Sequence, residues 1–388
     1  MKSLSSIALA IQPSKIRQMF NLAHGKKNVI SFALGEPDFS TPEYIQKAAC
    51  EAVRNGKTKY TQNAGIKELR EAYAKSISEE YAIEYNADNE IIVTAGGMGA
   101  LSTALMVMLN PGDEVIVTNP GWTNYIQQIS IAGGTPKPVD VFEKDEFALT
   151  AENFEKAIDK KTKAVVINSP ANPTGSVISE KRLREIAEVA SKYDLYVISD
   201  EVYRNIVFEG EHNSIAKFDG MRERTIIVDS FSKSYSMTGF RVGIAAGPKD
   251  IIGLMVKYQE NLVACANSVA QYAAREALGG SQKKLKEMVR CYKKRRDIIT
   301  EAINGIEGLS CVRPSGTFYA FVNIEKTGML CEEFAVSLFE KEKVVVIPGT
   351  AFGTAGEGYI RLSFATSESN IEKGLERIEN FVKKIGNM

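Results

Sequence analysis

The chain has 388 residues, of which 44% are hydrophobic, and its 48 Lys and Arg balance 48 Asp and Glu. That composition suits a globular protein with a large core and more than one domain. Zero net charge excludes a general nucleic-acid or anionic-membrane binder, which needs a basic excess, although it leaves room for a local cluster of positive charge.

Segments that would target or anchor the chain are not expected. The N-terminal apolar patch, about seven residues long, is interrupted by Gln12 and Pro13, and no apolar run reaches the roughly 18 residues of a membrane span. The five cysteines form no C-x-x-C pair, and there are only two histidines, so no metal site is expected. The sequence therefore predicts a reduced, cytoplasmic protein.

In chain order, the first clear element is a helix over 41–56, which Thr41 and Pro42 open and Gly56 ends. Short runs rich in Val and Ile then alternate with helical patterns, among them a helix over 179–194. Strands are expected at 90–95, 114–119, 163–168, 195–200, 225–230 and 242–247. This alternation predicts a mostly parallel sheet covered by helices on both faces.

The C-terminal part has a different pattern. A long helical region from about 250 to 304 precedes strand-like segments at 316–324, 343–349 and 359–365. We expect these segments to form a smaller α+β domain, with a boundary near 280–290.

Ligands of an open parallel sheet collect beyond the carboxyl ends of its strands, so the residues that follow each strand are candidates for a site. GGMGAL (96–101) could cradle one phosphate at a helix N-terminus, or it could be a plain tight turn. Asp200 ends an apolar strand, where it needs a cationic partner or serves as a helix N-cap. Asn172 lies between two prolines in a stiff turn, and Trp122 follows a strand beside glycines, where it could stack on a flat ligand or fill the core.

Lys233 follows the strand at 225–230 and stands among hydroxyl side chains, eight positions before Arg241. A surface lysine is the ordinary alternative, but a partly desolvated lysine near other cations has a lowered pKa and can attack a carbonyl. Arg241 suits phosphate oxygens. Together with the glycines, Trp122 and Asp200, these residues indicate an aromatic aldehyde with one phosphate and a basic ring nitrogen, which is pyridoxal 5′-phosphate (PLP).

The sequence resembles a PLP-dependent fold-type-I aminotransferase of the class I/II family, in the subgroup of bacterial and archaeal aspartate and aromatic aminotransferases. The resemblance covers essentially the whole chain, and its motifs are LGEPDF (34–39), KYTQNAGIKELR (59–70), GGMGAL (96–101), NPGW (119–122), NSPANPTG (168–175), SDEVY (199–203), SFSKSYSMTGFRVG (230–243), PSGTFYAF (314–321) and YIRLSFA (359–365).

The resemblance implies an α/β fold in which a large domain over 47–285 holds a mostly parallel, seven-stranded sheet sandwiched by helices. A smaller α+β domain would combine 1–46 with 286–388. It also implies a homodimer, in which Tyr60 reaches the phosphate of the neighbouring subunit's cofactor.

The resemblance further implies a role for each site residue. Lys233 would hold PLP as an imine and act as general acid and base, and Asp200 would keep the pyridine nitrogen protonated. Tyr203 and Asn172 would bind the ring's phenolic oxygen. The other roles are stacking on the ring and substrate contact for Trp122, the phosphate grip for Gly96, Gly97, Met98, Ser230 and Arg241, and the substrate α-carboxylate for Arg361, Gly35 and Asn172.

The implied reaction transfers an amino group from an L-amino acid to a 2-oxo acid, with 2-oxoglutarate as the expected acceptor, by ping-pong kinetics. Met98 stands where some aspartate-preferring relatives carry a lysine, which leaves aspartate, aromatic and other donors open. Ile16 and Arg17 could touch the side-chain pocket or pack on the partner subunit. Alternatives are a carbon–sulfur β-lyase, which uses the same carbanion chemistry, and a non-catalytic regulator.

Overall fold

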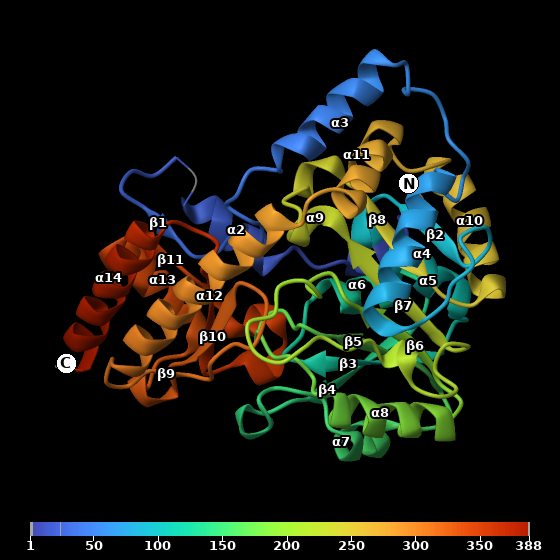
Figure 1. The fold of residues 1–388 in the computed structure, drawn as a ribbon. Coiled ribbons are helices and arrows are strands. Elements are labelled where there is room, and N and C mark those ends of the chain that lie inside the picture. The colour runs from blue at the N-terminus through green and yellow to red at the C-terminus, as the bar shows by residue number, and fades with distance from the viewer. Residues whose placement is uncertain (1–2, 24, 387–388) are drawn as a thin grey trace.

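The computed structural model describes residues 3–23 and 25–386, drawn in Figure 1. Its main feature within these residues is a seven-stranded sheet. In spatial order its strands are β2 (Ile91–Thr94), β8 (Gly243–Ala246), β7 (Thr225–Ser230), β6 (Tyr196–Asp200), β5 (Thr162–Asn168), β3 (Glu114–Asn119) and β4 (Thr135–Asp140).

The sheet is mostly parallel, as predicted, and β8 alone among these described strands runs antiparallel to both of its neighbours. All six predicted strands are present. The edge strand β4 was not predicted, because two prolines interrupt its sequence and Val139 is its single buried residue. Proline is tolerated on an edge strand because no second neighbour needs its missing N–H.

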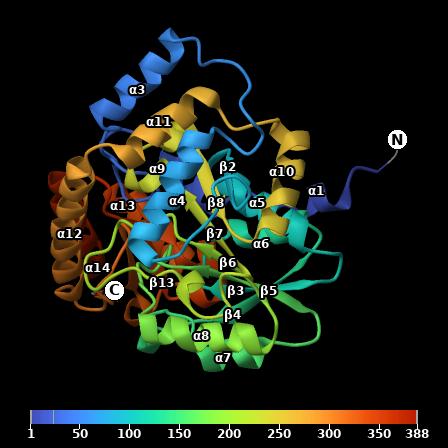
Figure 2. The same cartoon turned by 45° about the vertical axis from the view of Figure 1, so that its right-hand side comes forward.

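Helices cover both faces of the sheet (Figures 1 and 2). Side chains on β5 alternate between the faces: Val165 packs in the same apolar cluster as α8 (Glu180–Lys192), and Val166 packs with α5 (Gly96–Met108). The remaining helices before residue 280 are α1 (Ser6–Ala10), α2 (Lys15–Ala23), α3 (Glu43–Arg54), α4 (Lys67–Tyr81), α6 (Asn124–Ile131), α7 (Ala151–Ala157), α9 (Phe231–Ser234), α10 (Lys249–Val263) and α11 (Ser268–Gly279).

Two predicted helices are confirmed. The helix expected at 179–194 is α8, which Ser179 caps by accepting a hydrogen bond from the Arg182 N–H. The helix expected at 41–56 is α3, with Pro42 at its N-cap position. Thr41 precedes that position, and its hydroxyl donates to the Ser236 carbonyl at 2.6 Å.

A second, antiparallel sheet occupies the C-terminal part, with strands β12 (Ile347–Pro348), β13 (Tyr359–Ser363), β10 (Tyr319–Asn323) and β9 (Ser310–Cys311) in spatial order. It is accompanied by α12 (Lys283–Asn304), α13 (Cys331–Glu342) and α14 (Glu368–Gly386). Close by, β1 (Ile30–Ser31) pairs in parallel with β11 (Val344–Val345), which brings the N-terminal segment to this side of the molecule. The domain bounds expected from the sequence remain a prediction, and the 285/286 division falls inside α12.

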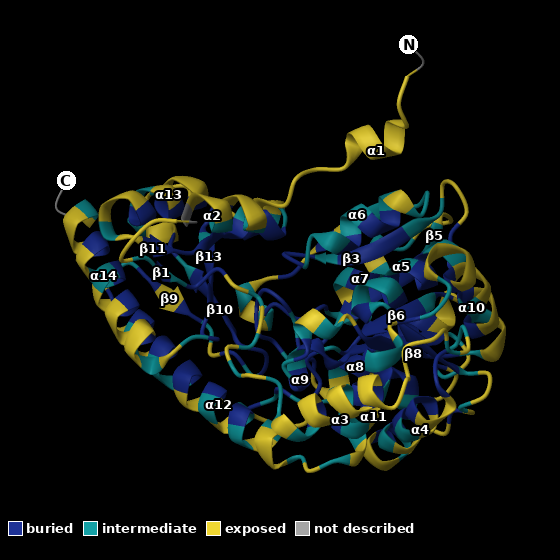
Figure 3. Ribbon diagram, turned by 90° about the horizontal axis from the view of Figure 1, so that it is seen from above, coloured by how far each residue is buried: buried dark blue, intermediate teal, exposed yellow. Residues whose placement is uncertain are grey.

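Two further features concern the surface. Figure 3 shows α1 standing away from the body, and none of its residues is buried. None of the helices formed by residues 3–23 and 25–386 is both long enough and apolar enough to cross a bilayer.

Candidate active site

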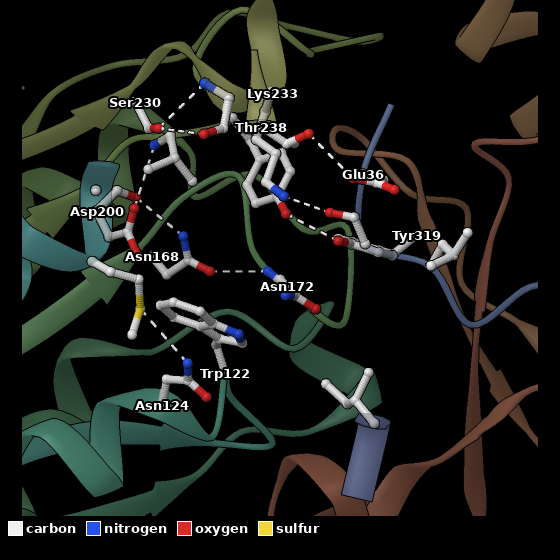
Figure 4. A pocket seen from close by; sticks show the side chains of 18 of the residues that line it. Glu36, Trp122, Asn124, Asn168, Asn172, Asp200, Ser230, Lys233, Thr238 and Tyr319 are labelled. Carbon is white, nitrogen blue, oxygen red and sulfur yellow. Dashed lines mark hydrogen bonds between the residues drawn. The ribbon is translucent and has the colours of Figure 1, made fainter. Parts of the chain in front are cut away.

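A cavity of about 520 Å³ opens beyond the carboxyl ends of the central strands (Figure 4), and its lining also includes Tyr319 and Arg361 of the second sheet. The structure brings together most of the predicted site residues here. The lining includes Gly35, Gly97, Met98, Trp122, Asn172, Asp200, Tyr203, Ser230, Lys233, Arg241 and Arg361. A cavity of this size holds a cofactor-sized ligand.

Lys233 reaches the cavity from α9, the short helix that follows β7. Its ammonium donates to the Gly35 carbonyl and lies 5.8 Å from the ring centroid of Tyr203 and 6.0 Å from that of Phe318. Burial, followed by the positive charge of Arg361, lowers the pKa of Lys233 to about 8. About a tenth of the side chain is then the neutral, nucleophilic amine at pH 7, far more than for an unperturbed lysine with a pKa of 10.5.

Asp200 ends β6 and is 4% exposed. Its carboxylate accepts hydrogen bonds from the Tyr125 hydroxyl at 2.5 Å and from the Val202 N–H at 3.3 Å, and both donors are neutral. Burial raises the pKa of Asp200 to about 6, although the Tyr125 hydrogen bond acts in the opposite direction. A cationic ligand group beside this carboxylate would relieve that cost.

Two side chains that the sequence suggested for one ring oxygen both reach the cavity. Asn172 is held by its backbone N–H, which donates to the Asn168 Oδ1 at 2.9 Å, while Asn168 Nδ2 donates to the Asp200 carbonyl at 3.1 Å. Tyr203 is 3% exposed, and its hydroxyl lies 3.0 Å from the hydroxyl of Tyr319. Asn168 thus connects the two turns that carry Asp200 and Asn172.

Arg361 is 1% exposed and lies in β13, between the rings of Tyr319 at 4.3 Å and Phe352 at 4.9 Å. Its Nη1 donates to Asn172 Oδ1 at 3.1 Å and its Nη2 to the Ala33 carbonyl at 2.8 Å. Its buried Nε has no hydrogen-bond partner among the described residues. Burial also lowers the pKa of this guanidinium, which shows that its positive charge is poorly compensated. A bound carboxylate would supply both a negative charge and a hydrogen-bond partner for Nε.

The opposite end of the cavity is suited to an anion. The helix α5 begins at Gly96, so the first N–H groups of the helix and its dipole point toward this end. Gly96 has a φ of +74°, and a Cβ there would lie 2.5 Å from Arg241 Nη2, so glycine is required for the close approach. Ser230 lies beside them, with its Oγ donating to Ser232 Oγ at 3.0 Å.

Trp122 lies in the turn after β3 and packs edge-on against Tyr125, with 5.2 Å between their ring centroids. Met98 is fixed by its sulfur, which accepts from Gln128 Nε2 at 3.2 Å and from Asn124 Nδ2 at 3.6 Å. At the mouth of the cavity, Ile16 and Arg17 of α2 contribute to the lining. This location favours contact of Ile16 and Arg17 with the side-chain pocket over packing on a partner subunit.

Two predicted residues lie outside the cavity lining. Gly96 lies close to Arg241, as described, whereas Tyr60 is 89% exposed and does not line the cavity of its own chain. Sequence reasoning missed Tyr125, Tyr319 and Asn168. The spacing from Trp122 to Tyr125 was an available signal, because residues three apart lie on one side of a helical turn.

Three comparisons with known proteins identify the family to which the chain belongs. The model of the family "Aminotransferase class I and II" matches residues 27–378. The chain is 43% identical to the aspartate aminotransferase of Pyrococcus abyssi, over 96% of this chain and 97% of that protein. It is 41% identical to aromatic-amino-acid aminotransferase 2 of Thermococcus litoralis, over 98% and 99% of the two chains.

Among solved structures, the aspartate aminotransferase of Thermus thermophilus with maleate superimposes with a TM-score of 0.94, at 37% identity, over 98% of this chain and 100% of that one. The whole fold described above therefore recurs at close superposition in an enzyme of amino-group transfer. The chain belongs to the class I and II aminotransferases, and it is a transferase.

Proposed function

We propose that the protein is a PLP-dependent aminotransferase that moves an amino group between an L-amino acid, of the aspartate or aromatic type, and a 2-oxo acid. The observation that carries the proposal is that Lys233 and Asp200 face one cavity with their pKa values shifted by burial in opposite directions. Both shifts favour a ligand that offers a carbonyl to the lysine and a positive charge to the carboxylate.

The residues present fit PLP at three separate points. The Asp200 carboxylate accepts from the neutral donors Tyr125 and Val202, and a protonated pyridine nitrogen would add the positive charge that it lacks. The start of α5 with Arg241 suits a phosphate. Lys233 suits the aldehyde carbon, because its lowered pKa supplies a neutral amine. When bound, PLP supplies an electron sink for the pair of electrons left when a substrate Cα–H bond breaks.

In this mechanism Lys233 is the general acid and base. With PLP bound, its neutral amine would take the proton from the substrate Cα and carry it toward the cofactor. The pKa near 8 keeps both the amine and the ammonium accessible at neutral pH, which a proton carrier requires. Asp200, held by Tyr125, would keep the ring nitrogen protonated, and Tyr203 and Asn172 would bind the ring oxygen.

Arg361 is proposed to bind the substrate α-carboxylate. Its two Nη atoms are already oriented by Asn172 and Ala33, so the guanidinium is fixed before substrate arrives. Gly35 closes this side, and a Cβ there would lie 2.8 Å from the Tyr319 hydroxyl, so no larger residue leaves the same space. Such positioning converts binding energy into orientation at the reacting carbon.

The names of the relatives support aspartate and aromatic donors, and the mouth of the cavity fits both. Ile16, Phe20 and Leu34 offer apolar surface, while Arg17 offers a positive charge for a distal carboxylate. We take 2-oxoglutarate as the acceptor and ping-pong kinetics as the order of events, in keeping with the family. Met98 replaces a lysine found in some aspartate-preferring relatives, which argues for a broad donor range.

A homodimer completes the proposal, with Tyr60 contacting the phosphate bound by the neighbouring subunit. The high exposure of Tyr60 supports this role. Exposed apolar side chains on α1 and α10 offer surface for a second copy, namely Ile7, Leu9, Leu254, Tyr258, Leu262 and Val263. The cytoplasmic location expected from the sequence stays a prediction.

A half-reaction screen tests the proposal. Purified protein loaded with PLP is mixed with each L-amino acid, with no oxo acid present, while the absorbance of the cofactor is followed. We expect aspartate and aromatic amino acids to convert the band to that of the aminated cofactor, and 2-oxoglutarate to restore it. Release of pyruvate and ammonia without any acceptor would identify a lyase instead, and protein that binds no PLP would overturn the assignment.

A further inference from the structure

The turn that carries Trp122 is tied to the segment that underlies Arg361. The C-terminal part contributes two short 3₁₀ helices, η5 (Gly349–Phe352) and η6 (Thr354–Gly356), and the carbonyl of Phe352 accepts from the Gly121 N–H at 2.8 Å. This backbone bond joins the turn after β3 to the loop 349–356. It crosses between the parts of the molecule that hold the two sheets.

Asn119 makes the rest of the connection through its side chain. Its Nδ2 donates to Thr354 Oγ1 at 3.0 Å and to Asp140 Oδ1 at 2.7 Å, and its Oδ1 accepts from the Ala355 N–H at 3.2 Å. Asn119 is 5% exposed. Both ends of its amide therefore point to fixed partners, two in the loop and one in β4, and the amide can hold the loop in one place.

The fit around this amide is close. Gly353 has a φ of +121°, and a Cβ at that position would lie 2.0 Å from Asn119 Oδ1. Only glycine allows the loop to approach the amide in this conformation. Because the contact leaves no room for a methyl group, the loop fits Asn119 in one position only. A shift of the loop would break its hydrogen bonds to Asn119 and Gly121 together.

Each side of this contact leads to the proposed site. On one side, Trp122 follows Asn119 by three positions, and its ring packs on Tyr125, the donor to Asp200. On the other side, the Phe352 ring lies 4.9 Å from the Arg361 guanidinium. In the same loop, Thr350 accepts from Lys15 at 3.5 Å, which connects the loop to α2 at the mouth of the cavity.

We propose that Asn119 is a positioning residue that fixes Trp122 relative to Arg361 through the loop 349–356. The proposal rests on the proposed function, in which Trp122 stacks on the cofactor ring and Arg361 binds the substrate carboxylate. A substrate that spans those two groups reacts only if their separation is held, so the amide acts through placement and touches neither ligand.

Trp122 gives a direct readout, because it is the single tryptophan of the chain. Asn119→Ala removes both side-chain ties to the loop. We expect its Trp122 fluorescence to become more accessible to acrylamide, with a quenching constant raised about twofold or more, in protein carrying no cofactor. With PLP and substrates, we expect the KM for amino acids to rise about tenfold while kcat changes by less than about threefold, the size expected for one buried hydrogen-bonding group.

A matched control separates placement from general loss of stability. Asn304→Ala removes an asparagine that also bridges two segments, with bonds to the Cys311 N–H at 2.8 Å and carbonyl at 3.2 Å, outside the cavity. We expect it to lower the melting temperature without changing quenching or KM. Equal changes of quenching in both alanine variants would mean that Asn119 has a structural role alone.

A charge-conserving exchange tests the hydrogen bond itself and covers the case in which Asn119→Ala does not fold. Asn119→Asp places two carboxylates against each other and should reproduce the changes in quenching and KM expected for Asn119→Ala. Combining it with Asp140→Asn restores a donor facing an acceptor, and we expect this double variant to recover wild-type quenching and KM. If Asn119→Asp does not differ from wild type in quenching, the proposal is wrong, whatever reaction the protein catalyses.

Discussion

The hydroxyl of Tyr125 donates a 2.5 Å hydrogen bond to the buried carboxylate of Asp200, and the same tyrosine packs edge-on against Trp122. One side chain therefore connects the residue proposed to face the ring nitrogen with the residue proposed to cover the ring face. The hydrogen bond does not offset burial, since the pKa of Asp200 is still raised to about 6. Ionised Asp200 therefore lowers the stability of the protein when no cofactor is bound.

The first prediction concerns the stability of cofactor-free protein. The pKa of Asp200 is about 6 when folded against 3.8 for an unperturbed aspartate, so its ionisation costs stability as the pH rises from about 4 to 6. Asp200→Asn removes that cost. We expect the free energy of unfolding to increase by up to about 3 kcal/mol at pH 7.5, because a difference of one in pKa corresponds to about 1.36 kcal/mol.

Urea unfolding at pH 5.0 and 7.5 measures the effect. The advantage of the asparagine variant should grow between the two pH values and should reverse once PLP is bound, because the ring nitrogen then loses its anionic partner. A cofactor-free variant less stable than wild type at pH 7.5 would contradict the assignment of a costly charge to Asp200.

The second prediction concerns Tyr125, which sequence reasoning did not select. Tyr125→Phe removes a donor that lowers the pKa of Asp200, so that pKa should rise further and the ring nitrogen should be less firmly protonated. We expect kcat to fall about tenfold, with the acidic limb of the pH profile moved upward. A Tyr235→Phe variant, whose hydroxyl bonds Gln282 at 3.1 Å, is the control and should leave the profile unchanged.

The third prediction concerns the nucleophile. Burial and Arg361 lower the pKa of Lys233 to about 8, so the neutral amine increases with pH up to that value. The rate at which cofactor-free protein takes up PLP covalently should rise about tenfold per pH unit below 8 and level off above it. Borohydride reduction and peptide mass analysis should place the label on Lys233. A plateau that is reached only near 10.5, the value of an unperturbed lysine, would show that this amine is not perturbed.

The fourth prediction separates the two arginines proposed for substrate. Arg361→Gln should raise the KM of every amino acid about 100-fold, because it removes the buried, oriented guanidinium proposed to bind the substrate carboxylate. Arg17→Gln should raise KM about fivefold for aspartate and 2-oxoglutarate alone, since an exposed pair contributes less. Steady-state kinetics with aspartate and phenylalanine distinguish them, and Arg54→Gln, an exposed site on α3, is the control. Equal effects of Arg17→Gln on both substrates would exclude it from distal carboxylate binding.

The fifth prediction tests the shared site. Lys233→Ala should lose almost all activity because it lacks the general acid and base, and Tyr60→Ala should be weakly active at low PLP concentration, where the phosphate contact matters most. If Tyr60 serves the neighbouring subunit, a mixed dimer contains one site with both residues intact. Mixing the two variants under exchange conditions should therefore restore a substantial part of the activity, and no gain on mixing would mean that Tyr60 acts within its own chain or not at all.

Much of this site could be predicted because its residues follow apolar strands. Lys233, Asp200 and Trp122 each come at or soon after the end of a run of Val and Ile, and parallel strands bring such positions to one edge. The strand β4 could not be found this way, since its prolines and exposed side chains carry no alternating apolar pattern. Its pairing comes from the neighbouring strand rather than from its own sequence.

Contacts between distant segments were also beyond sequence reasoning. Tyr319 lies against both Tyr203 and Arg361, and nothing in the local pattern around it indicates either neighbour. The same holds for Asn119, which looks like an ordinary residue before a proline and in the structure joins two parts of the chain. Such residues become visible only when tertiary packing is known, because their partners lie far along the chain or in another sheet.

The bond from Arg361 Nη2 to the Ala33 carbonyl connects positions 328 residues apart. Together with the pairing of β1 and β11, it means that the proposed carboxylate pocket is built from an early and a late part of the polypeptide. During translation, all strands of the large sheet are synthesised before Arg361, the hydrogen-bond partner of the Ala33 carbonyl. If Arg361 binds the substrate carboxylate as proposed, this ability is acquired late in synthesis, and a prematurely terminated chain lacks it even with Lys233 in place.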